Sequence, residues 1–436
     1  MKFYSTKNRS NLVSLREAVL KGMPEDNGLF MPRSVPELPG GFFDNISSMG
    51  FQEISLQIAN AFFGENLPAE DLEQIVTEAV NFDAPLVQVH DNIYSLELYH
   101  GPTLAFKDFG ARFMARMTAH FVKNSARELN ILVATSGDTG SAVASGFYDV
   151  PGINVIILYP SGKISEIQEK QIATLDKNIT ALEIDGVFDD CQKLVKQAFL
   201  DTELCSQIEL SSANSINVAR LIPQSFYYFY ACAQLQADSQ ADMVISVPSG
   251  NFGNLTAGLI ARRMGLPVEQ YIASTNINDV VPEYLGSGLF NPRPSKQTIS
   301  NAMDVGNPSN FDRILDLYDS DYDKILQDVS GSAYTDDQTR QMISRLEEET
   351  GYILDPHGAV GYMGLKHYLT EHRDTANGIF IETAHPAKFI DVVGPLVKNA
   401  PQIPERLGRF LDREKRSVKL KNDYAEFKSF LLDEKG

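Results

Sequence analysis

The segment NILVATSGDTGSAVASGFY, residues 130–148, decides the fold class. Its first six residues are an apolar run with the length of a buried strand, and residues 141–148 are expected to form a helix. A turn of Ser, Gly, Asp and Thr lies between them, and another apolar strand is expected at residues 155–159. Strand, helix and strand in this order predict a βαβ unit with parallel strands.

The same alternation extends outward from this unit. Apolar side chains recur every four residues after Lys107, which predicts a helix there: Phe109, Phe113, Met117 and Phe121. Asp189 or Asp190 is expected to cap another helix. Further strands are expected at residues 93–99, 243–247, 271–275 and 378–383. The sequence therefore predicts an α/β fold with a mostly parallel sheet and with functional loops at the carboxyl ends of its strands.

The chain divides into three regions by its pattern. Residues 1–90 form an N-terminal extension of turns and helical stretches, in which GLFMP (residues 28–32) is expected to be a buried turn. Residues 91–225 are assigned to a smaller α/β domain and residues 226–436 to a larger one, and the two domains are allowed to interleave. Residues 286–310 are rich in Gly, Pro, Ser and Asn and are expected to form an extended loop near a site or an interface. The charged tail after Arg406 is expected to be a solvated helical end.

Bulk composition limits the function classes. The 436 residues carry a net charge of −19, which disfavours binding to nucleic acid or to anionic membranes. The three cysteines are too widely spaced for a disulfide framework or a zinc site, and no histidine pair has metal-ligand spacing. Without an apolar run of signal or membrane-span length, we expect a cytoplasmic protein that binds a small molecule as a monomer or homodimer, without a metal.

HGPTLAFKDFG, residues 100–110, contains the first candidate for chemistry. Lys107 lies between apolar residues and an Asp-Phe-Gly turn. Burial would lower the pKa of its ammonium group, and a neutral amine can form a Schiff base with an aldehyde. The alternative is a lysine that decorates a turn and extends to water. The segment by itself favours neither.

Two glycine-containing loops follow predicted strands. SGNFGN, residues 249–254, precedes a helix, so its backbone amides suit an anion, although the loop lacks the dinucleotide-binding and P-loop spacings. TSGDTG, residues 135–140, has the same strand–turn–helix form and suits a carboxylate or phosphate. The alternatives are a tight turn for the first loop and, for the second, a helix cap formed by Asp138 or Thr139.

Other polar groups also follow predicted elements. SSANSIN, residues 211–217, and Arg220 offer donors before a helix, and Lys163 follows a strand, so these groups suit a dianionic phosphate. Ordinary surface charge is an equal alternative for the two cations. Thr383, in IETAHPAKF (residues 381–389), suits a hydrogen bond to a ring nitrogen, but a strand-ending turn is the better interpretation from the residues alone.

Taken together, HGPTLAFKDFG, ATSGDTG, LYPSGKIS, SANSIN, VPSGNFGN and TAHPAKF resemble the threonine synthase family, in the same order and over nearly the whole chain. The resemblance is to the longer microbial form, within the tryptophan-synthase-β-like (fold type II) pyridoxal-phosphate enzymes. It implies two open, mostly parallel sheet domains with the cofactor in the cleft between them. It also implies the conversion of O-phospho-L-homoserine and water into L-threonine and phosphate.

The resemblance assigns a role to individual residues. Lys107 would carry pyridoxal 5'-phosphate as a Schiff base and act as the catalytic base, Thr383 would face the pyridine nitrogen, and Asp138 would neighbour the phenolic oxygen, where related enzymes often have Asn. The cofactor phosphate would be held by Gly250, Asn251, Phe252, Gly253 and Asn254. Substrate would be held through its carboxylate by Thr135, Ser136, Gly137 and Thr139, and through its phosphate by Lys163, Ser212, Asn214, Asn217 and Arg220.

Two other functions fit the same residues. A serine/threonine dehydratase or a cysteine-synthase-like β-replacement enzyme would need no second phosphate site. A non-catalytic phosphate-binding scaffold would have no need for Lys107.

Overall fold

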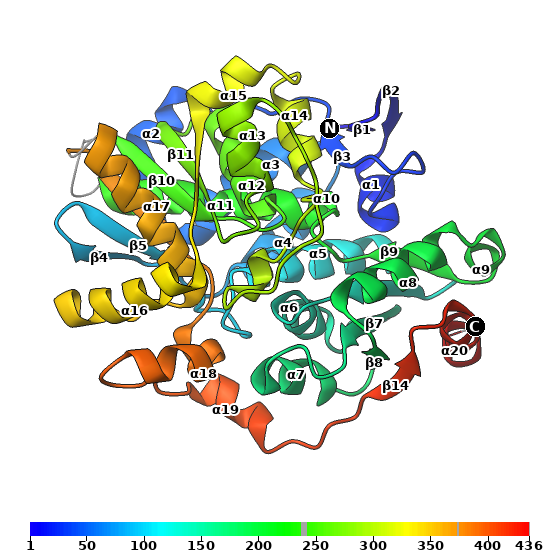
Figure 1. The fold of residues 1–436 in the computed structure, drawn as a ribbon. Coiled ribbons are helices and arrows are strands. Elements are labelled where there is room, and N and C mark those ends of the chain that lie inside the picture. The colour runs from blue at the N-terminus through cyan, green and yellow to red at the C-terminus, as the bar shows by residue number, and fades with distance from the viewer. Residues whose placement is uncertain (237–241, 373–374, 436) are drawn as a thin grey trace.

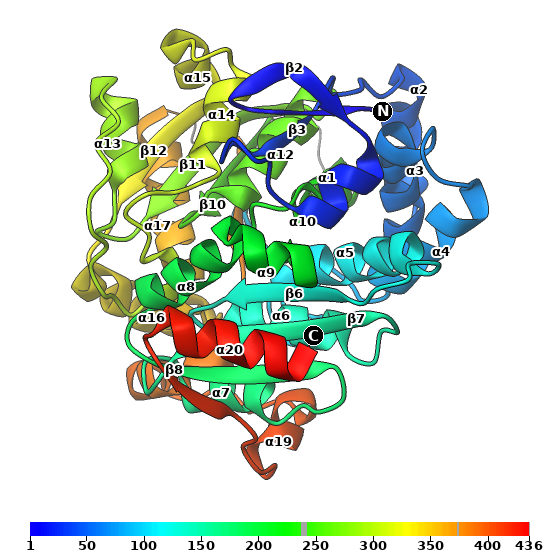
Figure 2. The ribbon, with the colours of Figure 1, turned by 90° about the vertical axis from the view of Figure 1, so that its right-hand side faces the viewer.

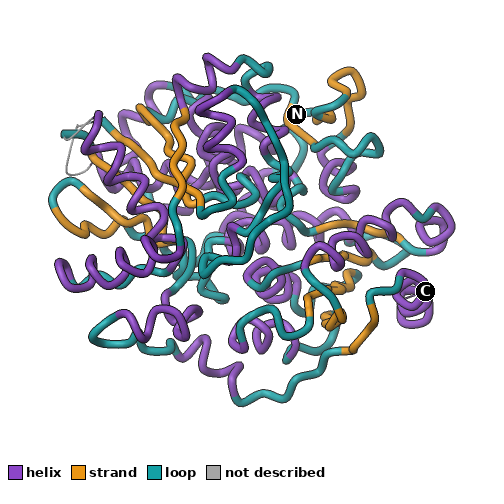
Figure 3. Tube along the Cα trace, viewed as in Figure 1, coloured by secondary structure: helices purple, strands orange, loops and turns teal. Residues whose placement is uncertain are grey.

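The structure is a computed structural model that describes residues 1–236, 242–372 and 375–435. Two sheets, each surrounded by helices, dominate it (Figures 1 and 3). This arrangement confirms the α/β class and the mostly parallel strands. No helix among the described residues is long and apolar enough to span a membrane.

The larger sheet has six strands in the order β12-β11-β10-β13-β5-β4. All neighbouring strands are parallel except β4, which pairs antiparallel with β5. The strands are β4 (Leu86–His90), β5 (Ile93–Glu97), β10 (Met243–Pro248), β11 (Val268–Thr275), β12 (Val329–Ala333) and β13 (Asn377–Glu382). Every residue of β10 and β13 is buried, as expected for central parallel strands that are covered on both faces.

Helices pack on both faces of this sheet. α17 (Pro356–His372) packs on β10, β11 and β13, while α12 (Gly253–Arg263) and α13 (Val280–Ser287) contact β11. The other elements of this part are α11 (Phe226–Gln236), η3 (Asn301–Met303), α14 (Phe311–Leu317), α15 (Tyr322–Asp328) and α16 (Asp336–Thr350). α16 begins with a capping box, since Thr335 and Gln338 each accept from the other's backbone N–H.

The smaller sheet has five parallel strands in the order β14-β8-β7-β6-β9. Its strands are β6 (Leu129–Ala134), β7 (Ile153–Pro160), β8 (Ile179–Asp185), β9 (Glu209–Ser212) and β14 (Val418–Lys421). The surrounding elements are α5 (Lys107–Val122), α6 (Asp138–Phe147), α7 (Glu166–Ala173), α8 (Phe188–Leu200), α9 (Thr202–Gln207), α10 (Val218–Leu221) and η2 (Ile222–Ser225). The strands expected at residues 130–135 and 155–159 are therefore confirmed as β6 and β7.

The cap of α8 differs from the expectation. Asp189 and Asp190 lie inside its first turn, and Val187 precedes the helix. Asp190 Oδ2 still accepts a hydrogen bond from the Val187 N–H, at 2.9 Å. A carboxylate in the first turn also stabilises the positive end of the helix dipole. The two aspartates thus mark the start of the helix as expected, but they lie in its first turn and not at the cap position.

The tail after Arg406 ends in a helix, as expected, but it packs on the smaller sheet domain rather than being only solvated. It contains the end of α19 (Glu405–Leu411), then β14 and α20 (Tyr424–Lys435). β14 extends the smaller sheet beside β8, and α20 lies against α8 and α9 (Figure 2). Phe427 and Leu431 are fully buried there. Apolar residues at helical spacing, rather than the charges, decide the position of this segment.

The N-terminal region contains an unexpected small sheet in the order β2-β1-β3. GLFMP is indeed buried, but its residues 30–32 form β3, which pairs antiparallel with β1. The elements are β1 (Phe3–Ser5), β2 (Asn8–Val13), α1 (Leu15–Lys21), β3 (Phe30–Pro32), α2 (Gly40–Asn45), η1 (Ile46–Ser48), α3 (Phe51–Phe63) and α4 (Ala69–Ala79). The remaining short elements, η4 (Pro386–Phe389), α18 (Ile390–Val393) and η5 (Gly394–Leu396), follow β13.

Candidate active site

Lys107 is the first residue of α5 and lies beside the end of β13. The Phe106 N–H donates to the Thr383 carbonyl at 2.8 Å, and the His385 N–H donates to Leu104 at 3.1 Å. An isolated β-bridge joins Ala105 to Ala384. These backbone contacts bring two segments that are far apart in the sequence, HGPTLAFKDFG and TAHPAKF, into one site.

Asp108 fixes the turn that presents Lys107. Its fully buried carboxyl group accepts from the Thr103 N–H at 2.8 Å and from the Thr103 hydroxyl at 2.7 Å. Burial raises the pKa of Asp108 to about 6, although the Thr103 hydrogen bonds oppose the shift. An ideal Cβ on Gly101 would lie only 2.4 Å from Asp108 Oδ2, so the turn requires glycine at that position.

Asp138 lies between two ammonium groups. Its Oδ1 is 2.7 Å from Lys388 Nζ, and its Oδ2 is 3.8 Å from Lys107 Nζ. Burial alone would raise the pKa of the Asp138 carboxyl, but the two lysines and a hydrogen bond from Gln168 outweigh burial and hold it well below its usual range. Burial lowers the pKa of Lys107, and the Lys388 charge adds to this effect while Asp138 opposes it. The result is a charged carboxylate next to an amine that loses its proton more readily than an ordinary lysine.

The sequence interpretation missed Lys388. Its side chain is fully buried and also donates to the Thr103 carbonyl at 2.9 Å. A signal was present, because Lys388 lies between Ala387 and Phe389, which is the same apolar setting that singled out Lys107. Its partner, Asp138, is distant in the sequence, so nothing local revealed the pair.

The 135–140 loop follows β6 and begins α6 at Asp138. Neither Asp138 nor Thr139 caps this helix through its side chain; instead, Thr135 Oγ1 accepts from the N–H groups of Gly137 and Gly140, at 3.0 and 2.8 Å. Gly137 has φ 134°, and a Cβ there would meet the Gln168 side chain at 2.5 Å. The Thr135 cap leaves Ser136 and Thr139, both half-buried, with hydroxyls that bond to no described residue.

The 249–254 loop follows β10 and precedes α12. Phe252 adopts a left-handed conformation (φ 60°), and the helix begins at Gly253. No described residue accepts a hydrogen bond from the backbone N–H groups of residues 250–254. Unpaired amides at the start of a helix fit an anion, so this loop passes the test for a phosphate cradle.

Hydrogen bonds of the Asn251 and Asn254 side chains hold the 249–254 loop in place. Asn251 bonds to the Ser215 hydroxyl through Nδ2, at 2.5 Å, and accepts from the Ser309 N–H at 2.6 Å. Asn254 Oδ1 accepts from the hydroxyls of Tyr227 and Tyr228 at 2.6 and 2.8 Å. Residues 286–310 therefore pack on the candidate phosphate cradle.

The candidate substrate-phosphate residues fall into different settings. Asn214 Nδ2 donates to the Ala134 carbonyl at 2.9 Å, which joins SSANSIN to the start of the 135–140 loop. Ser212 ends β9 and is buried, whereas Lys163 is exposed in the turn after β7. Asn217 is fully buried and caps α10, with Oδ1 accepting from the Ala219 N–H and with Nδ2 on two backbone carbonyls. Its amide is thus already used by the protein.

Arg220 is a buried cation without a carboxylate partner among the described residues. One of its nitrogens donates to the Ala213 carbonyl at 2.6 Å, and its Nε has no partner in that part of the chain. Burial lowers the pKa of the Arg220 guanidinium to about 10. Leaving a buried guanidinium unpaired is costly, so this position favours an anionic ligand.

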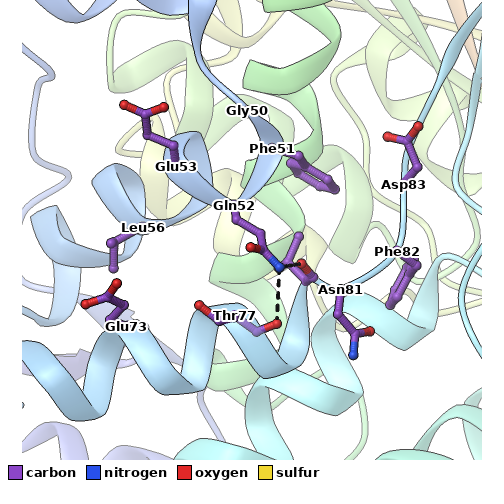
Figure 4. Close-up of a pocket in the computed structure, with 11 residues that line it drawn as sticks. Gly50, Phe51, Gln52, Glu53, Leu56, Glu73, Thr77, Asn81, Phe82 and Asp83 are labelled. Atoms are coloured by element: carbon purple, nitrogen blue, oxygen red, sulfur yellow. Dashed lines mark hydrogen bonds between the residues drawn. The ribbon is translucent and has the colours of Figure 1, made fainter.

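A groove of about 750 Å³ lies away from Lys107, between α3, α4 and the segment that follows α4 (Figure 4). Its charged lining residues are Glu53, Glu73 and Asp83, which are all acidic. This groove therefore does not suit a phosphorylated ligand.

Comparisons with known proteins agree over the whole chain. Residues 2–80 match the family model described as threonine synthase N terminus, residues 77–382 the model of pyridoxal-phosphate dependent enzymes, and residues 358–431 the model of the threonine synthase C-terminal region. The chain is 45% identical to the threonine synthase of Escherichia coli (strain K12) over 434 residues, which cover 99% of this chain and 100% of that protein.

Two solved structures are similar along the full length. The crystal structure of threonine synthase from Escherichia coli superposes with a TM-score of 0.93 at 43% identity and covers 100% of both chains. A threonine synthase from Brucella melitensis, solved with bound pyridoxal phosphate, gives a TM-score of 0.93 at 35% identity and covers 100% of this chain and 99% of that one.

Proposed function

This chain belongs to the threonine synthase family of pyridoxal-phosphate-dependent enzymes, and from that premise we propose how its residues convert O-phospho-L-homoserine and water into L-threonine and phosphate. This reaction is the last step of threonine biosynthesis. The single observation that carries the residue assignment is the apolar, charge-flanked setting of Lys107 beside Thr383.

The protein's residues suit each end of the cofactor. The unpaired amides of residues 250–254 would hold its phosphate, and the Lys107 amine would hold its aldehyde group. The Thr383 hydroxyl, which bonds to no described residue, would be a hydrogen-bond partner for the ring nitrogen that does not protonate it. When bound, pyridoxal phosphate supplies an electron sink for the carbanions that the reaction requires.

Lys107 performs the proton transfers. Because burial lowers its pKa, Nζ is disposed to be a neutral amine and would take the α-proton of the substrate. It then moves protons at the β and γ carbons as phosphate leaves from the γ carbon and water adds at the β carbon. Asp138 keeps its negative charge near Nζ, and Lys388 balances that charge so that the carboxylate does not repel an anionic substrate.

Substrate binding uses the carboxyl edge of the smaller sheet. Ser136, Gly137 and Thr139 hold the substrate carboxylate, in a loop that Thr135 caps. Arg220, Ser212, Asn214 and, at the mouth, Lys163 receive the substrate phosphate. We leave Asn217 out of this group because its amide already bonds to the backbone.

The second phosphate site separates this function from the dehydratase and β-replacement alternatives. A buried arginine without a carboxylate partner among the described residues is expected where a dianion binds, and those alternatives bring no such dianion. The three unpaired cysteines, Cys191, Cys205 and Cys232, suit a reducing compartment, and we place the enzyme in the cytoplasm.

The test is a product analysis of the protein purified with pyridoxal phosphate. O-phospho-L-homoserine should yield inorganic phosphate and threonine in equal amounts, while L-serine and L-threonine should yield little ammonia. Lys163→Gln should raise KM for the phosphorylated substrate more than it lowers kcat, because it removes only a binding charge. Ammonia release from serine without threonine formation would instead establish the dehydratase.

A further inference from the structure

Two carboxyl groups are fully buried next to the site and have no role in the reaction described above. Asp355 precedes α17, and Glu382 ends β13, one residue before Thr383. Among the described residues, neither forms an ion pair with a lysine or an arginine. Two neighbouring buried carboxyl groups that form no ion pair with a lysine or an arginine cannot both be charged without a large cost in free energy. One of the two is therefore expected to carry a proton.

The hydrogen bonds locate that proton. The Asp355 N–H donates to Glu382 Oε1 at 2.6 Å, and Asp355 Oδ1 accepts from the N–H and the Nδ1 of His357 at 2.7 and 2.6 Å. One oxygen on each carboxyl group, Asp355 Oδ2 and Glu382 Oε2, has no hydrogen-bond partner in the described chain, while the Asp355 N–H and side chain both act on Glu382. A proton on Glu382 that is donated to Asp355 satisfies both oxygens.

The electrostatic surroundings agree with this placement. Burial raises the pKa of Glu382 well above its usual range, and the negative charges of Asp355 and Glu97 add to the shift. Burial would raise the pKa of Glu97, but hydrogen bonds from His100, at 2.8 Å, and from Tyr99 and Tyr352 outweigh it and lower the pKa. The Tyr352 hydroxyl donates its hydrogen bond to Glu97, at 2.9 Å, and not to Glu382.

Three further groups face the pair from neighbouring segments. Tyr99 is close to both Glu97 and Glu382, and Lys107 and His385 interact electrostatically with Asp355. Burial lowers the pKa of His385 to about 4, so it is neutral near pH 7. Lys107 thus acts on Asp355 as a cation whose own proton is labile.

His357 continues the network toward the phosphate cradle. Its Nε2 accepts from the Ala302 N–H at 3.2 Å, so in the neutral ring the proton is on Nδ1 and is donated to Asp355. Ala302 packs directly on the cradle, because an ideal Cβ on Gly250 would lie 2.5 Å from the Ala302 carbonyl oxygen and 2.7 Å from Met303 Cα. The network therefore runs from the residue before Thr383 to the loop that covers Gly250.

We propose that Glu382, Asp355 and His357 form a one-proton relay of positioning residues that holds the ring-nitrogen end and the phosphate end of the cofactor site in register. The relay rests on the roles proposed above for Thr383 and for residues 250–254. In this network each hydrogen bond has one donor and one acceptor. The side chains keep this single arrangement only while Glu382 and Asp355 together hold one proton. Losing the proton places two negative charges together, and losing His357 releases Ala302 from the relay.

The first test measures unfolding of the cofactor-free protein by urea as a function of pH. Because Glu382 holds a proton in the folded chain at pH values where the unfolded chain has lost it, the stability that it contributes falls as the pH rises above about 4.5. Relative to Glu382→Gln, whose amide donates at every pH, the wild-type unfolding constant should grow by up to about tenfold per pH unit until Glu382 ionises. Parallel pH curves for the two proteins would overturn the proton assignment.

The second test measures binding of pyridoxal phosphate and of pyridoxal to His357→Phe, which keeps the ring but cannot form either hydrogen bond. The Kd for pyridoxal phosphate should rise by about tenfold, while the Kd for pyridoxal, which lacks the phosphate, should change little. Equal changes for both ligands, or none, would overturn the link to the cradle. If this variant does not fold, the comparison of Glu382→Gln with the wild type decides the proposal, and neither readout depends on turnover.

Discussion

At Lys107, burial and two nearby cations act against a nearby carboxylate. Burial, Lys388 and Arg220 favour the neutral amine, whereas Asp138 favours the ammonium form. The balance lowers the pKa, which is what a nucleophilic and basic lysine requires. The same pocket keeps Asp138 charged, so one shared environment favours the deprotonated form of both groups, a neutral amine and a charged carboxylate.

Lys107→Ala should abolish the visible absorption band of the bound cofactor and lower kcat by at least about 10²-fold, because covalent attachment and the catalytic base are lost together. Lys196→Ala, which removes an exposed lysine on α8, is the matched control and should leave both unchanged. Absorption spectra and steady-state kinetics measure the two effects. A Lys107→Ala protein with the wild-type spectrum would contradict the assignment.

Lys388→Met should destabilise the protein by about 3–5 kcal/mol, because it leaves the Asp138 carboxylate buried without its closest partner. The double variant with Asp138→Asn should recover most of that loss, since no charge is then left unpaired. Urea unfolding of the two single variants and the double variant gives the coupling energy. Additive losses would show that the two side chains do not depend on each other.

At the scale of elements, the two candidate anion loops have the same construction. In each, a fully buried parallel strand ends in a glycine-containing turn that starts a helix, β6 before α6 and β10 before α12. The carboxyl ends of parallel strands lie at one edge of a sheet, and ligands of open α/β sheets bind outside that edge. Each sheet therefore has its loop at the edge where a ligand is expected to bind.

β14 depends on a charge in the neighbouring strand. Glu183, in β8, contacts Lys415 at 2.6 Å and accepts from the Ser417 hydroxyl at 3.2 Å. Burial alone would raise the pKa of Glu183, but Lys415 and Ser161 outweigh it and lower the pKa to about 2.

Glu183→Gln should therefore lower stability at pH 7, and the difference from the wild type should shrink as pH falls from about 4.5, where the unfolded carboxylate takes up its proton, toward about 2. Urea unfolding at pH 7 and at pH 3.5 measures this change. A difference that is the same at both pH values would show that packing, not charge, accounts for the effect.

At the scale of the whole molecule, the two sheets are not built from consecutive halves of the chain. β5 joins the sheet of β10 and β13, while β14, near the end of the chain, joins the sheet of β8. The chain thus crosses between the two sheets several times, which ties the ends of the site to segments at both ends of the sequence (Figure 1).

The molecule also concentrates positive charge at one place within an acidic whole. Its net charge is −19, yet the Lys388 and Arg220 charges both act on Lys107. A local field of this kind can hold a phosphorylated substrate that the overall field would repel.

Phe427→Ala should destabilise the protein by about 3–5 kcal/mol, because the ring is fully buried among apolar residues of α8 and β8. Thermal and urea unfolding measure the loss, and hydrogen exchange of the β14 amides should become faster. Tyr148→Ala, at a partly exposed ring, serves as the control of similar size. An unchanged Phe427→Ala protein would mean that the tail is the solvated appendage that its charges suggest.

Sequence alone was sufficient for the features that contiguous residues encode. The strand–loop–helix units, the helix after Lys107 and the glycine loop at residues 249–254 were all predicted. Periodicity and turn chemistry act over a few residues, so they can be read without knowing the fold. The error at the C-terminal tail arose because charge was weighed above the buried apolar spacing of Phe427 and Leu431.

Only the tertiary structure decided which residues and strands contact one another. Asp138 meets Lys388, Asp355 meets Glu382, and β14 meets β8 through contacts between distant parts of the chain. A buried charge or proton takes its state from whatever surrounds it, and packing chooses those surroundings. The sequence by itself identified a lysine that follows an apolar turn and two glycine-containing loops that follow strands; the packing of the sheets determined the charged neighbours of that lysine and buried Asp355 and Glu382 together.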